Sequence, residues 1–171
     1  MNIVLIGMRG TGKTTIGNML SQSLKRDFIE TDELIAKKSG RTIADLVNTF
    51  GWNYFRDLES RVVQEVSLRS DAVISTGGGV IMRDENVNEL KGNGFLVLLT
   101  ANIDTMVRRL AHDADRPSLT AKQTMREEIS EVLRLRKSQY KKACQVQIAT
   151  DDQSLDAVVQ KILEIVKERN I

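Results

Sequence analysis

The octapeptide at residues 7–14, Gly-Met-Arg-Gly-Thr-Gly-Lys-Thr, constrains the fold of this chain more than any other feature, because it matches the pattern G-x-x-x-x-G-K-[ST]. Glycines let the backbone wrap so closely around a phosphate that successive N–H groups point at its oxygens. The β-branched run at residues 2–6 is typical of a buried parallel strand, and a helix is expected to begin near Lys13. A merely structural glycine turn is the alternative, which this context disfavours. The sequence therefore predicts nucleoside triphosphate chemistry in an α/β domain.

Two side chains of this loop have predicted ligands. Lys13 is expected to bridge the β and γ phosphates of the nucleotide. Thr14 is expected to offer its hydroxyl to Mg²⁺, which prefers oxygen ligands and normally arrives with the triphosphate. We therefore expect Mg²⁺ as the cofactor.

The composition indicates a single soluble domain over residues 1–171. The chain is 41% apolar and 28% charged, and its single proline leaves no stretch that resembles a linker. A net charge of +2 gives little reason to expect a nucleic-acid partner. The longest apolar runs are far shorter than the roughly 20 residues that cross a bilayer. Because the lone Cys144 fits a reducing compartment and the first strand leaves no room for a signal peptide, we expect a cytoplasmic monomer with no membrane partner.

Strand and helix signals alternate along the chain, which favours a parallel sheet with helices on both faces. The expected strands are residues 2–6, 28–30, 72–75, 95–99 and 145–149. The expected helices are residues 14–25, 32–38, 42–50, 52–68, 102–110 and 155–168, with another helix before the last strand. Residues 111–123 are polar and lack periodicity, so they are expected to form a mobile loop. Polar residues that follow the strands are expected to converge at one edge of the sheet, where open α/β sheets bind ligands.

Asp32 follows the second expected strand and has two interpretations. It could be a residue that starts the next helix. In a phosphoryl-transfer enzyme, a carboxylate at this place would orient and deprotonate the attacking hydroxyl. The phosphate-binding loop favours the catalytic role.

Three consecutive glycines at residues 77–79 follow the third expected strand. They could form a sharp turn, but a tight turn needs only one or two glycines. A ligand that approaches the main chain closely is therefore the favoured explanation.

Three arginines form the last candidate group: Arg56, Arg116 and Arg136. Each of them alone would be read as a surface charge. Beside a phosphate site, together they suggest two-pronged grips on a substrate carboxylate and on the transferring phosphoryl group.

The combination of these motifs closely resembles the shikimate kinase family. The residues that carry the resemblance are 7–14, 29–32, 55–59, 77–79, Arg116-Pro117 with Leu119, and Arg136 with Tyr140. The similarity runs from the first strand to near Thr150. It implies the P-loop fold of nucleoside monophosphate kinase type, in which helices flank a five-stranded parallel sheet. It also implies transfer of the ATP γ-phosphoryl group to the 3-hydroxyl of shikimate, which gives shikimate 3-phosphate in aromatic amino acid (chorismate) biosynthesis.

The resemblance also implies roles for individual residues. It assigns ATP binding to Gly10, Thr11, Gly12, Lys13, Thr14, Thr15, Arg109 and Arg116. It assigns shikimate binding to Asp32, Arg56, Gly78, Gly79 and Arg136. It implies catalytic roles for Lys13, Asp32 and Arg116. Glu59 is implied to steady Arg56, residues 32–60 to form a substrate-binding helical insertion, and residues 111–123 to form a lid.

One position departs from the family pattern. Many members carry Asp where this chain has Glu30, a position linked to Mg²⁺ through water. A longer carboxylate could still fill that role, beside Thr14 as the direct ligand.

Three other functions are alternatives. Another small-molecule kinase of the same fold, acting on gluconate or a nucleoside monophosphate, is the nearest alternative. A GTP-dependent switch would need the motifs N-K-x-D and D-x-x-G, which do not follow the phosphate loop. An ATP-binding relative without catalysis is disfavoured by intact Lys13 and Asp32.

Overall fold

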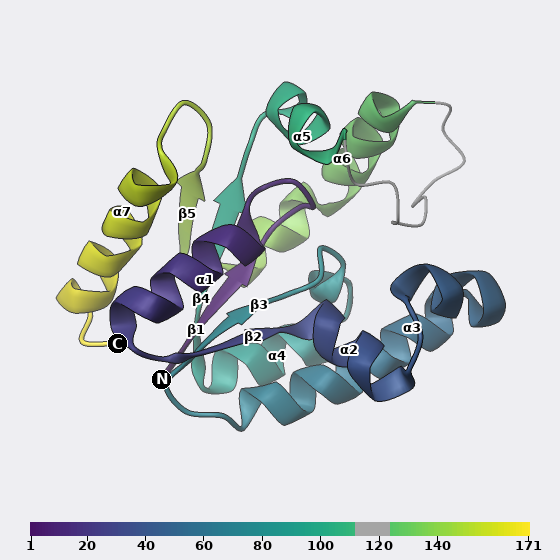
Figure 1. Ribbon diagram of the computed structural model, residues 1–171, viewed down its shortest axis with the longest axis horizontal. Coiled ribbons are helices and arrows are strands. Elements are labelled where there is room, and N and C mark those ends of the chain that lie inside the picture. The colour runs from purple at the N-terminus through teal and green to yellow at the C-terminus, as the bar shows by residue number, and fades with distance from the viewer. Residues whose placement is uncertain (112–123) are drawn as a thin grey trace.

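The computed structural model describes residues 1–111 and 124–171, in which a five-stranded parallel sheet runs through the centre (Figure 1). The strands lie in the order β2-β3-β1-β4-β5. Their bounds are β1 (Asn2–Ile6), β2 (Asp27–Glu30), β3 (Ala72–Ser75), β4 (Gly94–Thr100) and β5 (Val146–Ala149). The helices are α1 (Lys13–Leu24), α2 (Thr31–Ser39), α3 (Ile43–Ser67), η1 (a 3₁₀ turn, Val80–Met82), α4 (Asp84–Gly92), α5 (Ile103–Leu110), α6 (Met125–Ala143) and α7 (Leu155–Glu168). The predicted fold class is confirmed.

Both faces of the sheet are covered by helices, which explains why its central strand is apolar from Ile3 to Ile6. In β1, Val4 and Ile6 contribute to one hydrophobic cluster, and Ile3 and Leu5 contribute to the other. Helices α1 and α7 supply apolar side chains to the second cluster, whereas α3, α4 and α6 supply them to the first (Figure 1). A strand that is buried on both faces needs a continuous apolar run, as the sequence has here.

The strand order brings the polar segments of the chain together. β3 lies between β2 and β1, with Ser75 beside both Glu30 and Leu5. Because the strands are parallel, the segments that follow them leave the sheet at the same edge. These segments are the phosphate loop, the start of α2 and the three glycines.

One part of the fold agrees with the prediction under a single helix label, and one segment was not predicted. The helices expected at 42–50 and 52–68 form the two halves of α3, which are separated by Gly51 with φ 82° and ψ 168°. Residues 80–92, for which the sequence predicts no helix or strand, contain η1 and α4. The reason is that α4 buries only Asn86 and Leu90, too few positions for a clear helical period.

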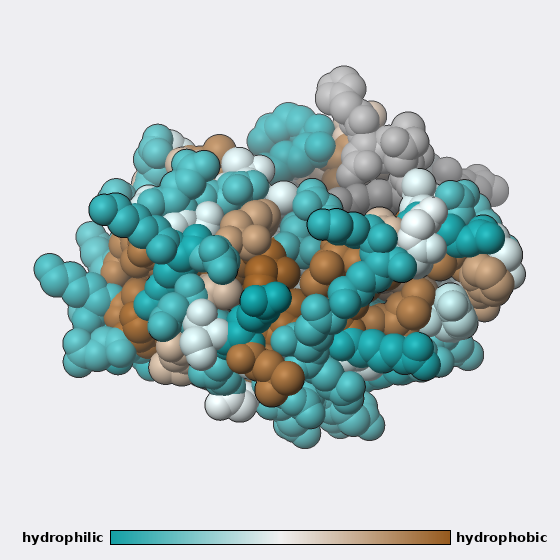
Figure 2. All heavy atoms as spheres, turned by 60° about the horizontal axis from the view of Figure 1, so that its bottom comes forward, coloured by the Kyte–Doolittle hydropathy of each residue, from teal (hydrophilic) through white to brown (hydrophobic). Residues whose placement is uncertain are grey.

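The surface of the described residues carries isolated apolar side chains among charged ones. In the view of Figure 2, hydrophobic residues are interspersed with hydrophilic ones. The exposed large hydrophobic residues of the described chain include Phe50, Leu68 and Met82. Within the described parts of the chain, none of the helices combines the length and apolar character that crossing a membrane requires. The loop predicted at 111–123 lies outside the described residues, except for Ala111.

The bend at Gly51 predicts a specific cost for a side chain at this position. Its backbone lies in a region that is essentially restricted to glycine, although no atom would lie within 4 Å of an added Cβ. We expect Gly51→Ala to lower the free energy of unfolding by about 1–3 kcal/mol, measured by urea denaturation. Gly92→Ala is the matched control, because an added Cβ there also meets nothing within 4 Å and the residue is helical. Equal stability changes in the two variants would contradict the prediction.

Candidate active site

The phosphate loop connects β1 to α1 through glycines in conformations that other residues rarely adopt. Gly7, Gly10 and Gly12 have φ values of 144°, 80° and 90°. A Cβ at Gly7 would collide with the carbonyl oxygen of Leu99 on the neighbouring strand. The residue that precedes α1 is Gly12, which has no side chain to cap the first N–H groups of this helix. Such a helix start is suited to bind an anion.

Lys13 is nearly buried and folds back along the loop. Its Nζ donates to the carbonyl oxygens of Gly7 at 3.0 Å and Met8 at 2.9 Å, and only 8% of the residue is exposed. Thr11 is held inside the loop, where its hydroxyl donates to the Met8 carbonyl at 2.7 Å. Thr14 and Thr15 are exposed on the first turn of α1. The N-terminal end of α1 therefore carries the ammonium group of Lys13 and two exposed threonines.

A cavity of about 390 Å³ lies next to this loop. It is formed by segments far apart in the sequence: the loop, the start of α2, both halves of α3, the glycines after β3, and α6. The predicted site residues among its lining are Glu30, Asp32, Arg56, Gly78, Gly79 and Arg136. The structure thus brings the predicted acceptor-binding residues together.

Arg56 is held in place inside this cavity by a buried carboxylate and an aromatic surface. Its Nη1 donates to Glu59 Oε2 at 2.7 Å, and the Glu59 side chain is fully buried. The guanidinium carbon lies 5.3 Å from the ring centre of Trp52 and 5.1 Å from that of Phe55. An ion pair on one side and two π faces on the other leave this arginine little rotational freedom.

Two of the three glycines, Gly77 and Gly79, have a packing role that the sequence did not reveal. A Cβ on Gly77 would lie 2.6 Å from Asp32 Oδ1 and 2.9 Å from Glu59 Oε1. A Cβ on Gly79 would collide with the guanidinium of Arg56. Charged side chains therefore pack directly against this backbone, which requires glycine independently of any ligand.

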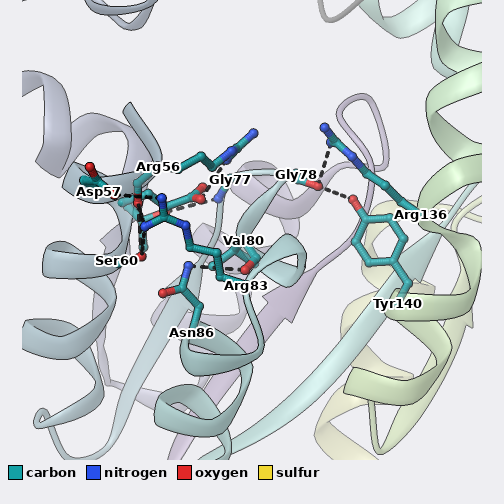
Figure 3. Close-up of polar contacts among 12 residues, drawn as sticks. Arg56, Asp57, Ser60, Gly77, Gly78, Val80, Arg83, Asn86, Arg136 and Tyr140 are labelled. Carbon is teal, nitrogen blue, oxygen red and sulfur yellow. Dashed lines mark hydrogen bonds and ion pairs between the residues drawn. The ribbon is translucent and has the colours of Figure 1, made fainter. Parts of the chain in front are cut away.

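Arg136 and Tyr140 share one acceptor in the glycine segment. Arg136 Nη1 donates to the Gly78 carbonyl oxygen at 3.1 Å, and the Tyr140 hydroxyl donates to the same oxygen (Figure 3). Burial raises the pKa of Tyr140 to about 12, so the hydroxyl keeps its proton at neutral pH. The carbonyl of Gly78 is thus held by two donors from consecutive turns of α6.

Two of the three arginines that line the cavity, Arg56 and Arg136, are arranged so that an anion could bind between them. Their guanidinium groups point toward each other across the space beside the glycine segment (Figure 3). Burial lowers the pKa of Arg136 from its ordinary value, and the nearby charge of Arg56 lowers it further. Two partly desolvated like charges repel each other, so an anion bound between them would be favoured.

Asp32 lies on the first turn of α2 and faces the same cavity. The preceding residue, Thr31, accepts a hydrogen bond from the Gly77 N–H at 3.1 Å, which ties the start of α2 to the end of β3. Met8 and Arg9 of the phosphate loop also line the cavity. The carboxylate therefore shares a cavity with the loop that would hold the nucleotide.

Arg109 contacts the phosphate loop outside this cavity. Its Nη1 donates to the Gly10 carbonyl at 3.2 Å and to Thr150 Oγ1 at 2.9 Å, and its Nη2 donates to the Thr150 carbonyl at 2.9 Å. It joins α5, the loop and the segment after β5. The other arginine predicted to bind ATP, Arg116, lies outside the described residues.

Sequence reasoning missed Arg9, which lines the cavity and forms an ion pair with Glu128 on α6. Arg9 stands at a variable position of the loop pattern, so no local signal marks it. Arg83 on the segment after η1 was also missed, because its partners on α3 are distant in the sequence.

The described residues contain no group of three or more His, Cys, Asp or Glu side chains that could hold a metal ion. Mg²⁺ in phosphoryl-transfer sites usually keeps several waters and binds through one or two protein oxygens plus phosphates. An exposed Thr14 on α1 and Glu30 at the cavity fit such a sparse donor set.

A phosphate-binding loop beside a cavity with a carboxylate and two facing arginines defines this protein as a P-loop kinase of a small molecule. The sequence pattern of the shikimate kinase family matches residues 9–167. The chain belongs to the shikimate kinase family.

Named relatives agree with this assignment. Shikimate kinase of Pelotomaculum thermopropionicum is 41% identical over 169 residues, which cover 99% of this chain and 97% of the relative. The crystallised shikimate kinase from Acinetobacter baumannii, in complex with shikimate, has a TM-score of 0.94 at 31% identity and covers 99% of this chain and 94% of its own. A gluconokinase from Sinorhizobium meliloti covers 98% of this chain and 91% of its own, with a TM-score of 0.59 at 15% identity, and shares the fold alone.

The buried Glu59 predicts a pH-dependent stability. Burial raises its pKa from the ordinary value near 4.5 to about 7; the Arg56 charge opposes this rise and the Asp32 charge adds to it. Between these two values the folded chain holds a proton that the unfolded chain releases. The free energy of unfolding should therefore fall as pH rises through this window, by at most about 1.4 kcal/mol per pH unit.

Urea denaturation across this pH range measures the effect as the difference between wild type and Glu59→Gln, which cannot titrate. We expect the stability of the wild type relative to the variant to decrease as pH rises. Glu65→Gln, on the same helix but exposed and paired with Lys38, is the control. A pH-independent difference for Glu59→Gln would show that this carboxyl does not titrate in the window.

Proposed function

We propose that this protein transfers the γ-phosphoryl group of ATP to the 3-hydroxyl of shikimate, giving shikimate 3-phosphate and ADP for aromatic amino acid (chorismate) biosynthesis. The observation that carries the proposal is the cavity beside the phosphate loop, where Arg56 and Arg136 face each other and Asp32 lies nearby. Membership of the shikimate kinase family supports the same substrate pair.

The two arginines would bind the carboxylate of shikimate. A guanidinium presents two parallel N–H donors that match the two oxygens of a carboxylate. Glu59 fixes the orientation of Arg56, and the Gly78 carbonyl fixes that of Arg136. Both donors are thus preorganised before the substrate arrives, and Gly78 and Gly79 would contact it through their backbone.

Asp32 would accept the proton of the attacking hydroxyl and orient it toward the phosphate loop. Lys13 would stabilise the charge that develops on the transferring phosphoryl group. Arg116 is proposed to assist it, with residues 111–123 as a lid that excludes water and residues 32–60 as the substrate-binding insertion.

ATP would bind along the loop, with its phosphates on the backbone of residues 10–15 and on Lys13, and with Arg109 beside the adenine. We propose Mg²⁺ as cofactor, held by Thr14 and through water by Glu30, where it would neutralise phosphate charge. We also propose that the protein acts as a monomer in the cytoplasm.

The substrate assignment is tested by measuring ADP release with shikimate, gluconate and AMP in parallel. We expect shikimate to be phosphorylated much faster than the other two, because its ring holds the carboxylate and the hydroxyls in a fixed relation, whereas gluconate has a flexible open chain and AMP carries a phosphate in place of a carboxylate. Asp32→Asn serves as the control for contaminating kinases and should lower kcat by about 10²–10⁴, the usual contribution of a positioned base. Faster phosphorylation of gluconate or AMP would overturn the assignment.

The carboxylate grip is tested by replacing either arginine with lysine, which keeps the charge but loses the two-pronged geometry. Arg56→Lys and Arg136→Lys should each raise the KM for shikimate and leave that for ATP nearly unchanged. A charge-assisted hydrogen bond is worth about 1.5–3 kcal/mol, which corresponds to about a ten- to hundredfold loss.

Methyl shikimate, in which the carboxylate is esterified, is the matched substrate control. It should be a poor substrate for the wild type and should lose little more in either lysine variant, because the same contact is already absent. Full additive losses would show that these arginines do not bind the carboxylate.

A further inference from the structure

Arg83 lies between η1 and α4, outside the lining of the cavity, yet its side chain reaches back to α3 (Figure 3). Its Nη1 donates to the carbonyl oxygen of Arg56 and to Ser60 Oγ, both at 3.1 Å. Its Nη2 forms an ion pair with Asp57 Oδ1 at 2.7 Å. One guanidinium thus binds three acceptors on a single turn of α3.

One of these acceptors belongs to the residue whose side chain lies in the cavity. The Arg56 carbonyl also accepts a hydrogen bond from the Ser60 hydroxyl at 3.0 Å. Glu59 holds the guanidinium of Arg56, whereas Arg83 and Ser60 hold its backbone. The two ends of Arg56 are therefore restrained by different parts of the chain.

The segment that carries Arg83 is continuous with the glycine segment. The Met82 N–H donates to the Gly79 carbonyl at 3.0 Å, and the Val80 N–H donates to the Gly77 carbonyl at 3.2 Å. The backbone of Gly79 in turn packs against the guanidinium of Arg56. Arg83 thus connects residues 79–83 to α3 at Arg56, the same residue whose guanidinium packs against Gly79.

We propose that Arg83 is a positioning residue that sets the distance between Arg56 and the glycine segment, and thereby the affinity for the acceptor. The identity of that acceptor rests on the proposed function. The ion pair with Asp57 contributes little, because the Asp57 side chain is 59% exposed. The positioning of Arg56 therefore depends on the hydrogen bonds from Arg83 to the Arg56 carbonyl and the Ser60 hydroxyl. A guanidinium can make these bonds and the ion pair at the same time because its donors are forked.

The kinetic test compares Arg83→Ala with variants that remove less. We expect Arg83→Ala to raise the KM for shikimate about tenfold, the effect of losing a hydrogen bond from a charged donor, with the KM for ATP unchanged. Arg83→Lys should give an intermediate value, and Asp57→Asn should stay within about twofold of the wild type. Lys91→Ala is the matched control, because Lys91 on α4 also donates to a distant carbonyl, that of Lys142, at 3.0 Å.

A double variant distinguishes positioning from general destabilisation. If Arg83 acts through Arg56, then Arg83→Ala should add little to the KM already raised by Arg56→Lys. Fully additive losses, or an equal rise in the KM for ATP and for shikimate, would overturn the proposal. If Arg83→Ala does not fold, Ser60→Ala and Arg83→Lys make the same comparison with milder changes.

The fluorescence of Trp52 gives a readout that does not depend on activity. Trp52 is the only tryptophan of the chain, and its ring centre lies 5.3 Å from the guanidinium carbon of Arg56. Arg83→Ala should shift the emission of the free protein, whereas Lys91→Ala should not. Unchanged emission would count against the proposal. If the wild-type protein did not phosphorylate shikimate, the proposed function would be wrong. The Trp52 emission would still test whether Arg83 positions Arg56.

Discussion

The buried ion pair between Arg56 and Glu59 is the interaction on which the geometry of the cavity depends. Taking two charges out of water is costly, and the pairing offsets this cost only when the geometry is good and the remaining polar atoms are satisfied. Here Glu59 is fully buried, and the same burial raises its pKa to about 7. In return for this desolvation, the guanidinium of Arg56 is held in a fixed direction in the cavity.

The glycine segment makes this arrangement sterically feasible. Asp32, Glu59 and Arg56 all pack against the backbone of Gly77 and Gly79, at distances where a Cβ would collide. The carbonyl of Gly78 meanwhile orients Arg136 from the other side. The backbone of three residues is thus the common surface against which four charged side chains are placed.

The phosphate loop and the cavity are adjacent because of the strand order. The phosphate loop follows the central strand β1, the glycines follow its neighbour β3, and Asp32 lies just after β2. Because the strands are parallel, all three segments lie at one edge of the sheet. Arg109 binds the loop outside the cavity and joins it to the segment after β5.

The sequence by itself determined the phosphate loop, the alternation of strands and helices, and the candidate residues Asp32, Arg56 and Arg136. These follow from local requirements: glycines at positive φ, apolar runs on buried strands, and motifs of fixed spacing. The sequence did not predict the elements at residues 80–92 or the contacts of Arg9 and Arg83, nor did it show why glycine is needed at Gly77 and Gly79. Only the tertiary structure decided these, because each depends on contacts between residues far apart in the chain, which no local pattern encodes.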